Sequence, residues 1–524
     1  SVEYDRIAAN FSWTTIQLLH LLLRPLWTRV FSGVDVRPED IARIRTAMRD
    51  GAVILVPSHK SHFDYVLMSW VLYDHDLIVP HVVAGMNLAI WPISVLLRGA
   101  GGFFVKRSFS GDRLFPPVFA RYLRELIRQE YPIEFFIEGG RTRSGKLLPP
   151  KVGVLSMVLD AAELRSHGRE VTILPVALAY EQVAEEGAYA RELGGEQKRP
   201  ETLGQLLKAR SVLSRRFGRV YLRIADPIPC GPLVDARDGV ASWSETPEAD
   251  RKQALGRLGN TIVRELGDQV VLLPTSLVAL ALLAAPVRAI RHGELLDRIR
   301  RLDALLRHLG VNRAASLDRF DQAITQALDR FVRDRRITPL DLHGERVWAI
   351  DPDQRITLDY AKNQVVHRLA PAGLVAAAIR PVSSGAVPDR PFTAAAIAER
   401  FRLLVGTLRR EFIWDRDVDA ILAEGLAHLT VHGALVANPD GTHAVADPVR
   451  IGELYGLVRS LLEGYLVVAT DRFWPSTRDA LTAAIHADQS ALVAAGAVTR
   501  PESLSVVILQ NAVGTYVDDG VLED

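Results

Sequence analysis

Residues 52–65 read AVILVPSHKSHFDY, which is a run of five apolar residues, a turn, and then a cluster of polar side chains. An uninterrupted apolar run of this length is typical of a strand that is buried on both faces of a sheet. Comparable runs, bounded by turn-forming residues and separated by helix-length segments, occur at 102–105, 133–137, 171–178 and 220–224. This alternation predicts an α/β fold in which a mainly parallel or mixed sheet is flanked by helices.

The remaining chain predicts further domains, because 524 residues are too many for one compact core. Residues 1–50 read as helices whose apolar residues suit either membrane contact or ordinary packing on a core, and the α/β domain follows over 51–230. The turn-rich, acidic stretch 231–250 is the predicted linker. Segments rich in Leu, Ala and Arg then predict a mainly helical domain over 251–524. Two short hairpins are expected within it, formed by 347–350 with 356–358 and by 434–436 with 443–445.

Charge and cysteine content argue against several classes of protein. Lys and Arg number 63 against 62 Asp and Glu, so bulk charge gives no argument for binding nucleic acid. The single cysteine, Cys230, excludes an intramolecular disulfide and a cysteine-based zinc cluster. The longest uncharged apolar run, 270–287, would reach only about 27 Å as a helix and contains Pro274 and Pro286. It therefore predicts a buried or interfacial helix rather than a membrane span.

The polar cluster after the first apolar run is the candidate catalytic site, because α/β sheets bind ligands at the carboxyl ends of their strands. A turn from strand into helix can bring together positions that are five residues apart. The carboxylate of Asp64 could then hold one imidazole nitrogen of His59 while the other nitrogen takes a proton from a hydroxyl group. We predict His59 as the general base and Asp64 as the group that orients it. His62 is an alternative partner, and a structural role for both histidines stays open.

Two basic segments follow two further predicted strands. The first ends on Lys106 and Arg107, and the second, 138–146, reads EGGRTRSGK. Backbone N–H groups exposed by glycines, with arginine side chains beside them, suit a phosphate monoester. The second segment also matches seven positions of the P-loop pattern. However, Leu147 replaces the hydroxyl residue that binds Mg²⁺, which argues against a P-loop NTPase.

Four short blocks together resemble the ordered motifs of the glycerolipid acyltransferases. They are HKSHFDY at 59–65, GFFVKR at 102–107, FIEGGR at 136–141 and ILPV at 173–176. Further segments are similar to the bacterial PlsB-type glycerol-3-phosphate acyltransferases, namely AGMNL at 84–88, EGGRTRSG at 138–145, KVGVLSM at 151–157 and YAKNQVVH at 360–367. The resemblance is strong over most of 50–230 and weaker through the helical C-terminal half.

The resemblance implies transfer of an acyl group from a thioester to the sn-1 hydroxyl of glycerol 3-phosphate, giving lysophosphatidic acid for phospholipid synthesis. It implies neither a metal nor another cofactor, and it assigns the roles of base and orienting group to His59 and Asp64. The resemblance places Glu138 in the phosphate and substrate pocket, whereas the residues alone give it no unique role, since it could position substrate or neutralise Arg141. The residues predicted to bind substrate are Lys60, Arg107, Glu138, Gly139, Arg141, Arg143, Lys146 and Pro175.

The acyl donor is predicted to be acyl-coenzyme A or acyl carrier protein. The candidate donor-binding residues lie in a basic segment that also includes Arg219 and Arg223, and they are Lys208, Arg210, Arg215 and Arg216. Such a segment could bind coenzyme A phosphates, an acidic carrier protein or anionic lipid, or form a solvated helix face. The resemblance also implies peripheral or monotopic attachment to the cytoplasmic face of the inner membrane. The alternative functions are dihydroxyacetone-phosphate acyltransferase and a catalytically silent membrane-peripheral scaffold.

Overall fold

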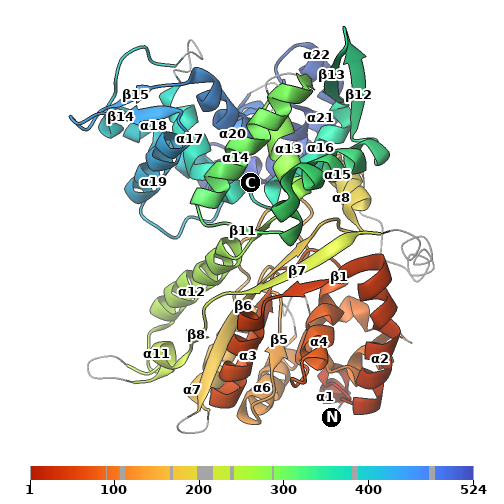
Figure 1. Cartoon of the computed structure of the whole chain (residues 1–524). Helices are drawn as coiled ribbons and strands as arrows, with labels where there is room; N and C mark the ends of the chain where they lie inside the picture. Colours follow the sequence, from red (N-terminus) through yellow and green to blue (C-terminus); the bar gives the residue numbers. More distant parts are fainter. Residues whose placement is uncertain are drawn as a thin grey trace. The chain divides into compact units, whose positions relative to one another are not determined.

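The computed structural model describes residues 2–89, 91, 93–106, 112–165, 169–196, 216–236, 241–285, 288–380, 387–470 and 478–522 (Figure 1). The chain divides into two compact units. Unit 1 comprises Ser1–Thr142, Leu148–Ala184 and Thr202–Val270, whereas unit 2 comprises Arg143–Leu147, Glu185–Glu201 and Val271–Asp524.

Unit 1 is built on an eight-stranded mixed sheet with the strand order β1-β7-β6-β2-β5-β3-β4, with β8 paired to β6. Strands β7 and β8 run antiparallel to β6, and all the other pairs in this sheet are parallel. The mixed α/β architecture predicted for this part of the chain is confirmed. The strands are β1 (Phe31–Val36), β2 (Gly51–Pro57), β3 (His81–Gly85), β4 (Gly102–Val105), β5 (Ile133–Glu134), β6 (Glu170–Tyr180), β7 (Gly218–Ile224) and β8 (Ile228–Pro229).

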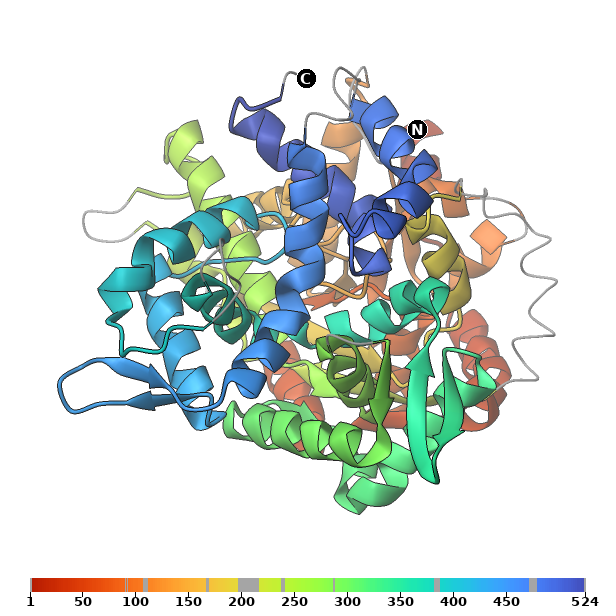
Figure 2. The same cartoon turned by 90° about the horizontal axis from the view of Figure 1, so that it is seen from above.

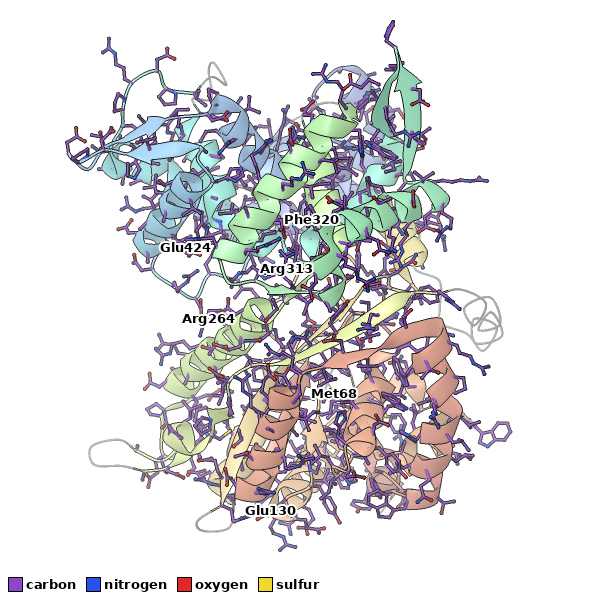
Figure 3. The ribbon with its side chains drawn as sticks, viewed as in Figure 1. Met68, Glu130, Arg264, Arg313, Phe320 and Glu424 are labelled. Atoms are coloured by element: carbon purple, nitrogen blue, oxygen red, sulfur yellow. The ribbon has the colours of Figure 1, made fainter. Side chains whose placement is uncertain are left out.

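Strand β2 lies in the middle of this sheet and is buried along its whole length, as its uninterrupted apolar sequence predicts. Amphipathic helices flank the sheet; α3 contacts β2, β6 and β7, and α12 contacts β6. Met68 of α4, labelled in Figure 3, is fully buried. The helices of unit 1 are α1 (Val2–Ile7), α2 (Trp13–Pro25), α3 (Pro38–Asp50), α4 (Asp64–Asp74), α5 (Ile93–Gly99), α6 (Phe115–Arg128), α7 (Gly153–Glu163), α11 (Gly231–Val234) and α12 (Glu248–Asp268).

Three strands of the sheet, β1, β3 and the two-residue β8, were not predicted. Strand β1 lies within the segment predicted to be helical, and it forms one edge of the sheet. Its sequence, FSGVDV, has no continuous apolar run, because most of its residues are only half-buried. Strand β3 is short and follows the sequence LIVP, so it does not stand out as a separate run.

The stretch 231–250 is part of unit 1 and is not a linker. It contains α11 and a buried Trp243, whose indole N–H donates to Asp160 at 2.8 Å. Arg165 also forms an ion pair with Asp235 at 2.7 Å. These anchors hold a turn-rich sequence against α7 and extend unit 1 to Val270.

Unit 2 is mainly helical around α13 (Pro274–Ala284), and all eleven residues of that helix are buried. This confirms the buried alternative for the described part of the apolar run, residues 270–285. Within the described part of the chain, we find no helix that is both long and apolar enough to cross a bilayer. The other helices of eight or more residues are α8 (Glu186–Leu193), α14 (His292–His308), α15 (Phe320–Arg333), α16 (Arg355–Asn363), α17 (Ala370–Ile379), α18 (Ala394–Thr407), α19 (Val418–Val431), α20 (Pro448–Ala469), α21 (Arg478–Ala487) and α23 (Val506–Asp518).

One predicted hairpin is confirmed, and the other is wrong. Strands β14 (Leu435–Ala437) and β15 (His443–Val445) pair antiparallel, and the hairpin projects in blue in Figure 2. Strand β13 (Glu345–Ile350) instead pairs with the preceding strand, β12 (Ile337–Leu342). The Asp351 side chain accepts the N–H of Asp353, and Pro352 occupies the first turn, so the chain enters a helix where a hairpin turn was expected.

Candidate active site

The loop after β2 and the first residue of α4 bring His59 and Asp64 together. The imidazole Nδ1 lies 3.0 Å from Asp64 Oδ2, and both side chains are buried. The same carboxylate oxygen accepts the backbone N–H groups of Lys60 at 2.6 Å and Ser61 at 2.8 Å. The turn between strand and helix therefore binds the carboxylate that orients the histidine, and His59, rather than His62, is the partner of Asp64.

Tyr180, near the end of β6, donates its hydroxyl to the other oxygen of Asp64. Both oxygens of Asp64 therefore accept hydrogen bonds. An acceptor at Oδ2 favours the His59 tautomer in which Nδ1 carries the proton and donates it in a hydrogen bond to Asp64. In that tautomer, His59 Nε2 is unprotonated and can act as a base. The sequence contained no signal for Tyr180, because its contact with Asp64 depends on the pairing of β6 with β2.

Two aromatic residues fix the plane of the imidazole ring. Phe136 stacks on His59 with ring centroids 4.0 Å apart, and the hydroxyl of Tyr65 lies 3.3 Å from Nε2. Both residues lie in motif blocks but had no predicted role. Burial lowers the pKa of His59, and the charge of Arg141 lowers it further, whereas the hydrogen bond to Asp64 opposes this shift. A histidine with a lowered pKa is neutral at pH 7, as a general base requires.

Glu138 holds the backbone of His59 in place. Its two oxygens accept the N–H of His59 at 2.6 Å and the N–H of Leu148 at 3.0 Å. Thr142 N–H also donates to the carbonyl of His59 at 2.9 Å. Burial raises the pKa of Glu138 to about 7, and the two backbone donors oppose that rise. In the structure, Glu138 thus holds the backbone of His59 and Leu148 in place, and its contact with substrate stays a prediction.

Three further residues predicted to bind substrate, Lys60, Gly139 and Pro175, also belong to unit 1. Lys60 is buried, and burial lowers its pKa to about 8, although the charges of Glu138 and Asp64 oppose the shift. Gly139 has a φ of +62°, and its N–H is already used in a turn to Phe136 O at 3.0 Å. Pro175 is buried inside β6, opposite Val56 of β2.

The remaining predicted site residues do not all belong to the described part of unit 1. Arg107, Lys208, Arg210 and Arg215 lie outside the described residues. Arg216 is exposed just before β7. Arg143 and Lys146 belong to unit 2, where they pair with the carboxylates of Glu192 and Glu411.

Arg223, which was included in the basic segment, has a structural role in the sheet. This side chain is buried and forms an ion pair with Asp35 of β1 at 2.7 Å. It links neighbouring strands of the sheet and is unavailable to an acyl donor.

Comparison with known proteins identifies the family. Residues 189–524 match the family model for the glycerol-3-phosphate acyltransferase C-terminal region, and residues 35–179 match the acyltransferase family model. The chain belongs to the glycerol-3-phosphate acyltransferase family. A crystal structure of the 1-acyl-sn-glycerophosphate (LPA) acyltransferase PlsC from Thermotoga maritima is similar at 20% identity and a TM-score of 0.29, over 48% of this chain and 79% of that chain.

Unit 1 of this acyltransferase has an apolar pocket that shares one residue with the candidate active site. Tyr65, whose hydroxyl lies beside His59 Nε2, is one of its lining residues. Helices α2, α4 and α5 and strands β3 and β4 supply the rest, including Ile16, Leu19, Leu23, Trp70, Val82 and Leu97. Most of these side chains are apolar, so the pocket is suited to an apolar ligand.

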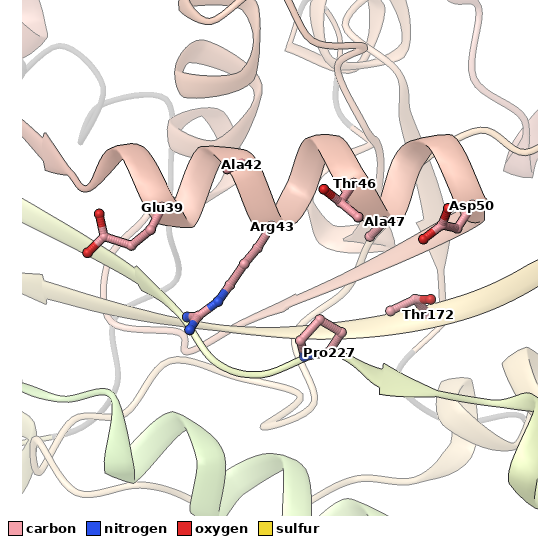
Figure 4. A pocket seen from close by; sticks show the side chains of 8 residues that line it. All are labelled: Glu39, Ala42, Arg43, Thr46, Ala47, Asp50, Thr172 and Pro227. Carbon is pink, nitrogen blue, oxygen red and sulfur yellow. The ribbon is translucent and has the colours of Figure 1, made fainter.

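A second, more open groove of the acyltransferase lies between α3 and the β6–β8 region, and Arg43 and Thr172 help to line it (Figure 4). Thr172 pairs with Val53, near the start of β2, whereas His59 follows the end of that strand. The groove is thus at the opposite end of the strands from His59 and is not part of the candidate active site.

One buried acid of this acyltransferase has a testable effect on stability. Glu134 of β5 is fully buried, and neither carboxyl oxygen has a hydrogen-bond partner among the described residues. Burial, with a smaller contribution from the charge of Asp64, raises its pKa well above the usual value. The folded protein keeps this proton over a pH range in which the unfolded chain has released it, so the stability contributed by Glu134 falls as pH rises above about 4.5.

Glu134→Gln removes this dependence. We expect its free energy of unfolding, relative to wild type, to increase with pH between 5 and 8, by up to about 1.4 kcal/mol per pH unit. Urea unfolding at three pH values measures the difference. Glu248→Gln, at an exposed position of α12, is the control and should show no such trend. A difference for Glu134→Gln that stays constant with pH would show that the wild-type carboxyl is ionised in the folded protein.

Proposed function

We propose that this acyltransferase moves a fatty acyl group from an acyl thioester to the sn-1 hydroxyl of glycerol 3-phosphate and releases lysophosphatidic acid. The observation that carries the proposal is the buried His59–Asp64 pair, with Nδ1 held by the carboxylate and Nε2 lying 3.3 Å from the hydroxyl of Tyr65, a residue that also lines the apolar pocket. This arrangement is suited to deprotonating a hydroxyl group next to a bound acyl chain.

In the proposed reaction, His59 Nε2 takes the proton of the hydroxyl group as its oxygen attacks the thioester carbonyl carbon. A carbon–oxygen bond forms, the carbon–sulfur bond breaks, and the imidazolium returns the proton to the departing thiolate. Asp64 holds the ring and stabilises its charged form during the reaction. We propose that no metal or other cofactor takes part in these steps.

Cationic side chains at the same end of the sheet support a phosphate-bearing acceptor. Lys60 is buried next to the motif, and Arg141 lies close enough to His59 for its charge to lower the pKa of the imidazole. Both cations would attract a phosphate dianion, and a guanidinium can bind two phosphate oxygens at once. This charge distribution favours glycerol 3-phosphate over a neutral polyol as the acceptor.

Exposed apolar side chains support attachment to a lipid surface. Trp13 and Leu22 of α2 are 54% and 62% exposed, and Trp91, just before α5, is 77% exposed. Helices α2 and α5 contact each other and also line the apolar pocket. A peripheral enzyme that rested on lipid through these helices would place the pocket next to the membrane that receives its product.

The proposal is tested by acyl transfer in phospholipid vesicles with labelled glycerol 3-phosphate and palmitoyl-coenzyme A or palmitoyl carrier protein. We expect 1-acyl-glycerol 3-phosphate as the product, co-sedimentation of the protein with the vesicles, and an unchanged rate in EDTA. Unlabelled dihydroxyacetone phosphate should compete poorly. Efficient competition by that compound would instead assign it as the acceptor, and inactivity with both donors would contradict the proposed reaction.

A further inference from the structure

The loop between β5 and α7 passes from one unit to the other and back. Residues up to Thr142 belong to unit 1, the five residues Arg143–Leu147 belong to unit 2, and the chain returns to unit 1 at Leu148. We call these five residues the inserted segment. It begins two residues after Arg141, a predicted phosphate ligand, in the sequence.

Both residues that flank the inserted segment are bound to the candidate active site. Thr142 N–H donates to the carbonyl oxygen of His59 at 2.9 Å, and Leu148 N–H donates to Glu138 Oε1 at 3.0 Å. Glu138 in turn accepts the N–H of His59 at 2.6 Å. A shift of the inserted segment would therefore reach His59 through two of its backbone groups. One is the carbonyl oxygen, which Thr142 contacts, and the other is the N–H, which Glu138 accepts.

Side chains of unit 2 hold the inserted segment itself. Asn363, the buried last residue of α16, donates its amide to the carbonyl oxygen of Ser144 at 2.9 Å and to Asp359 Oδ2 at 2.7 Å. Lys146 forms a buried ion pair with Glu411. Asn511 of α23 donates to the other oxygen of Glu411 at 3.1 Å, which fixes this carboxylate.

The backbone fit at Gly145 is equally close. Its φ is +83°, and a Cβ built there would lie 2.3 Å from the carbonyl oxygen of Tyr360. The segment 360–363, which belongs to the sequence motif YAKNQVVH, thus packs directly on the inserted segment. This contact gives the motif a structural role, although none of its residues belongs to the His59–Asp64 pair.

We propose that Asn363 and Glu411 are positioning residues for the acyl-transfer reaction. They hold the inserted segment, and through it they set the position of Arg141 and of the two backbone bonds at His59. The inference rests on the proposed function for its kinetic consequence, but its structural part can be tested independently. Loss of either anchor should weaken acceptor binding more than donor binding, because the affected loop carries the predicted phosphate ligand and no part of the apolar pocket.

The experiment compares wild type with Asn363→Ala and Glu411→Gln in two measurements. Hydrogen–deuterium exchange of peptides covering 139–150 should show Thr142 and Leu148 amides exchanging at least tenfold faster in both variants. The KM for glycerol 3-phosphate should rise at least tenfold, while the KM for palmitoyl-coenzyme A changes less than twofold. The matched control is Glu453→Gln in α20, a buried acid that pairs with Arg298 at 3.2 Å and does not contact the inserted segment.

Glu453→Gln should lower the thermal stability of the protein. It should change neither the exchange at 139–150 nor the KM for glycerol 3-phosphate. Unchanged exchange at 139–150 in both variants would overturn the inference, as would an equal increase in Glu453→Gln. If wild type shows no acyl transfer, the proposed reaction fails, while the exchange measurement still decides whether unit 2 holds the loop. If wild type is active and exchange increases without a change in the KM for glycerol 3-phosphate, the anchors are structural only and the positioning role is rejected.

Discussion

His59→Ala should lower kcat for acyl transfer by about 10²–10⁴-fold, because it removes the group that accepts the proton of the attacking hydroxyl. The KM for glycerol 3-phosphate should change much less, since the predicted phosphate ligands remain. Initial rates with labelled glycerol 3-phosphate measure the loss, and circular dichroism checks that the fold persists. Because burial lowers the pKa of His59, the acid limb of the wild-type kcat/KM profile should lie below pH 6.5.

His62→Ala is the matched control, because His62 lies in the same turn, whereas His59 is the histidine whose Nδ1 lies 3.0 Å from Asp64 Oδ2. We expect this variant to keep most of the wild-type rate. If His62→Ala were inactive and His59→Ala active, the roles of the two histidines would be exchanged. If both variants kept wild-type activity, neither imidazole would be the base.

Asp64→Asn should lower kcat by a similar factor, about 10²–10⁴, although no reacting atom touches this residue. An amide has one acceptor oxygen, whereas Asp64 accepts two backbone N–H groups, the Tyr180 hydroxyl and the His59 ring. One or more of these donors loses its partner, and each buried donor left unpaired costs about 1–3 kcal/mol. The imidazole is then free to adopt the tautomer in which Nε2 carries the proton. Rates and urea unfolding, measured together, test both consequences.

Tyr180→Phe provides the comparison for Asp64→Asn. It removes one donor from Oδ1 of Asp64 and leaves the His59 contact at Oδ2 intact, so a much smaller loss of rate is expected. A loss in Asp64→Asn of less than tenfold would show that the neighbouring groups orient His59 without the carboxylate.

Much of the fold of unit 1 could be predicted because its central strands have distinctive local sequences. The β2 run is apolar without interruption, since both faces are covered. Strand β1 could not be found in this way, because it lies at the sheet edge and most of its residues are only half-buried. The hairpin expected around 351–354 failed for a different reason, since Asp351 and Pro352 are also good residues for starting a helix.

The sequence by itself limited the partner of Asp64 to His59 or His62, since the turn between strand and helix is a local structure, and the hydrogen bond in the structure selects His59. Only the tertiary structure decided what holds that pair. Glu138 reaches His59 across 79 positions, Tyr180 reaches Asp64 across 116, and Asn363 reaches Ser144 across 219. Such contacts leave no periodic or spacing signal along the chain, because they depend on which strands pair and which helices pack. The chemistry of the site is therefore encoded locally, and its rigidity arises from long-range packing.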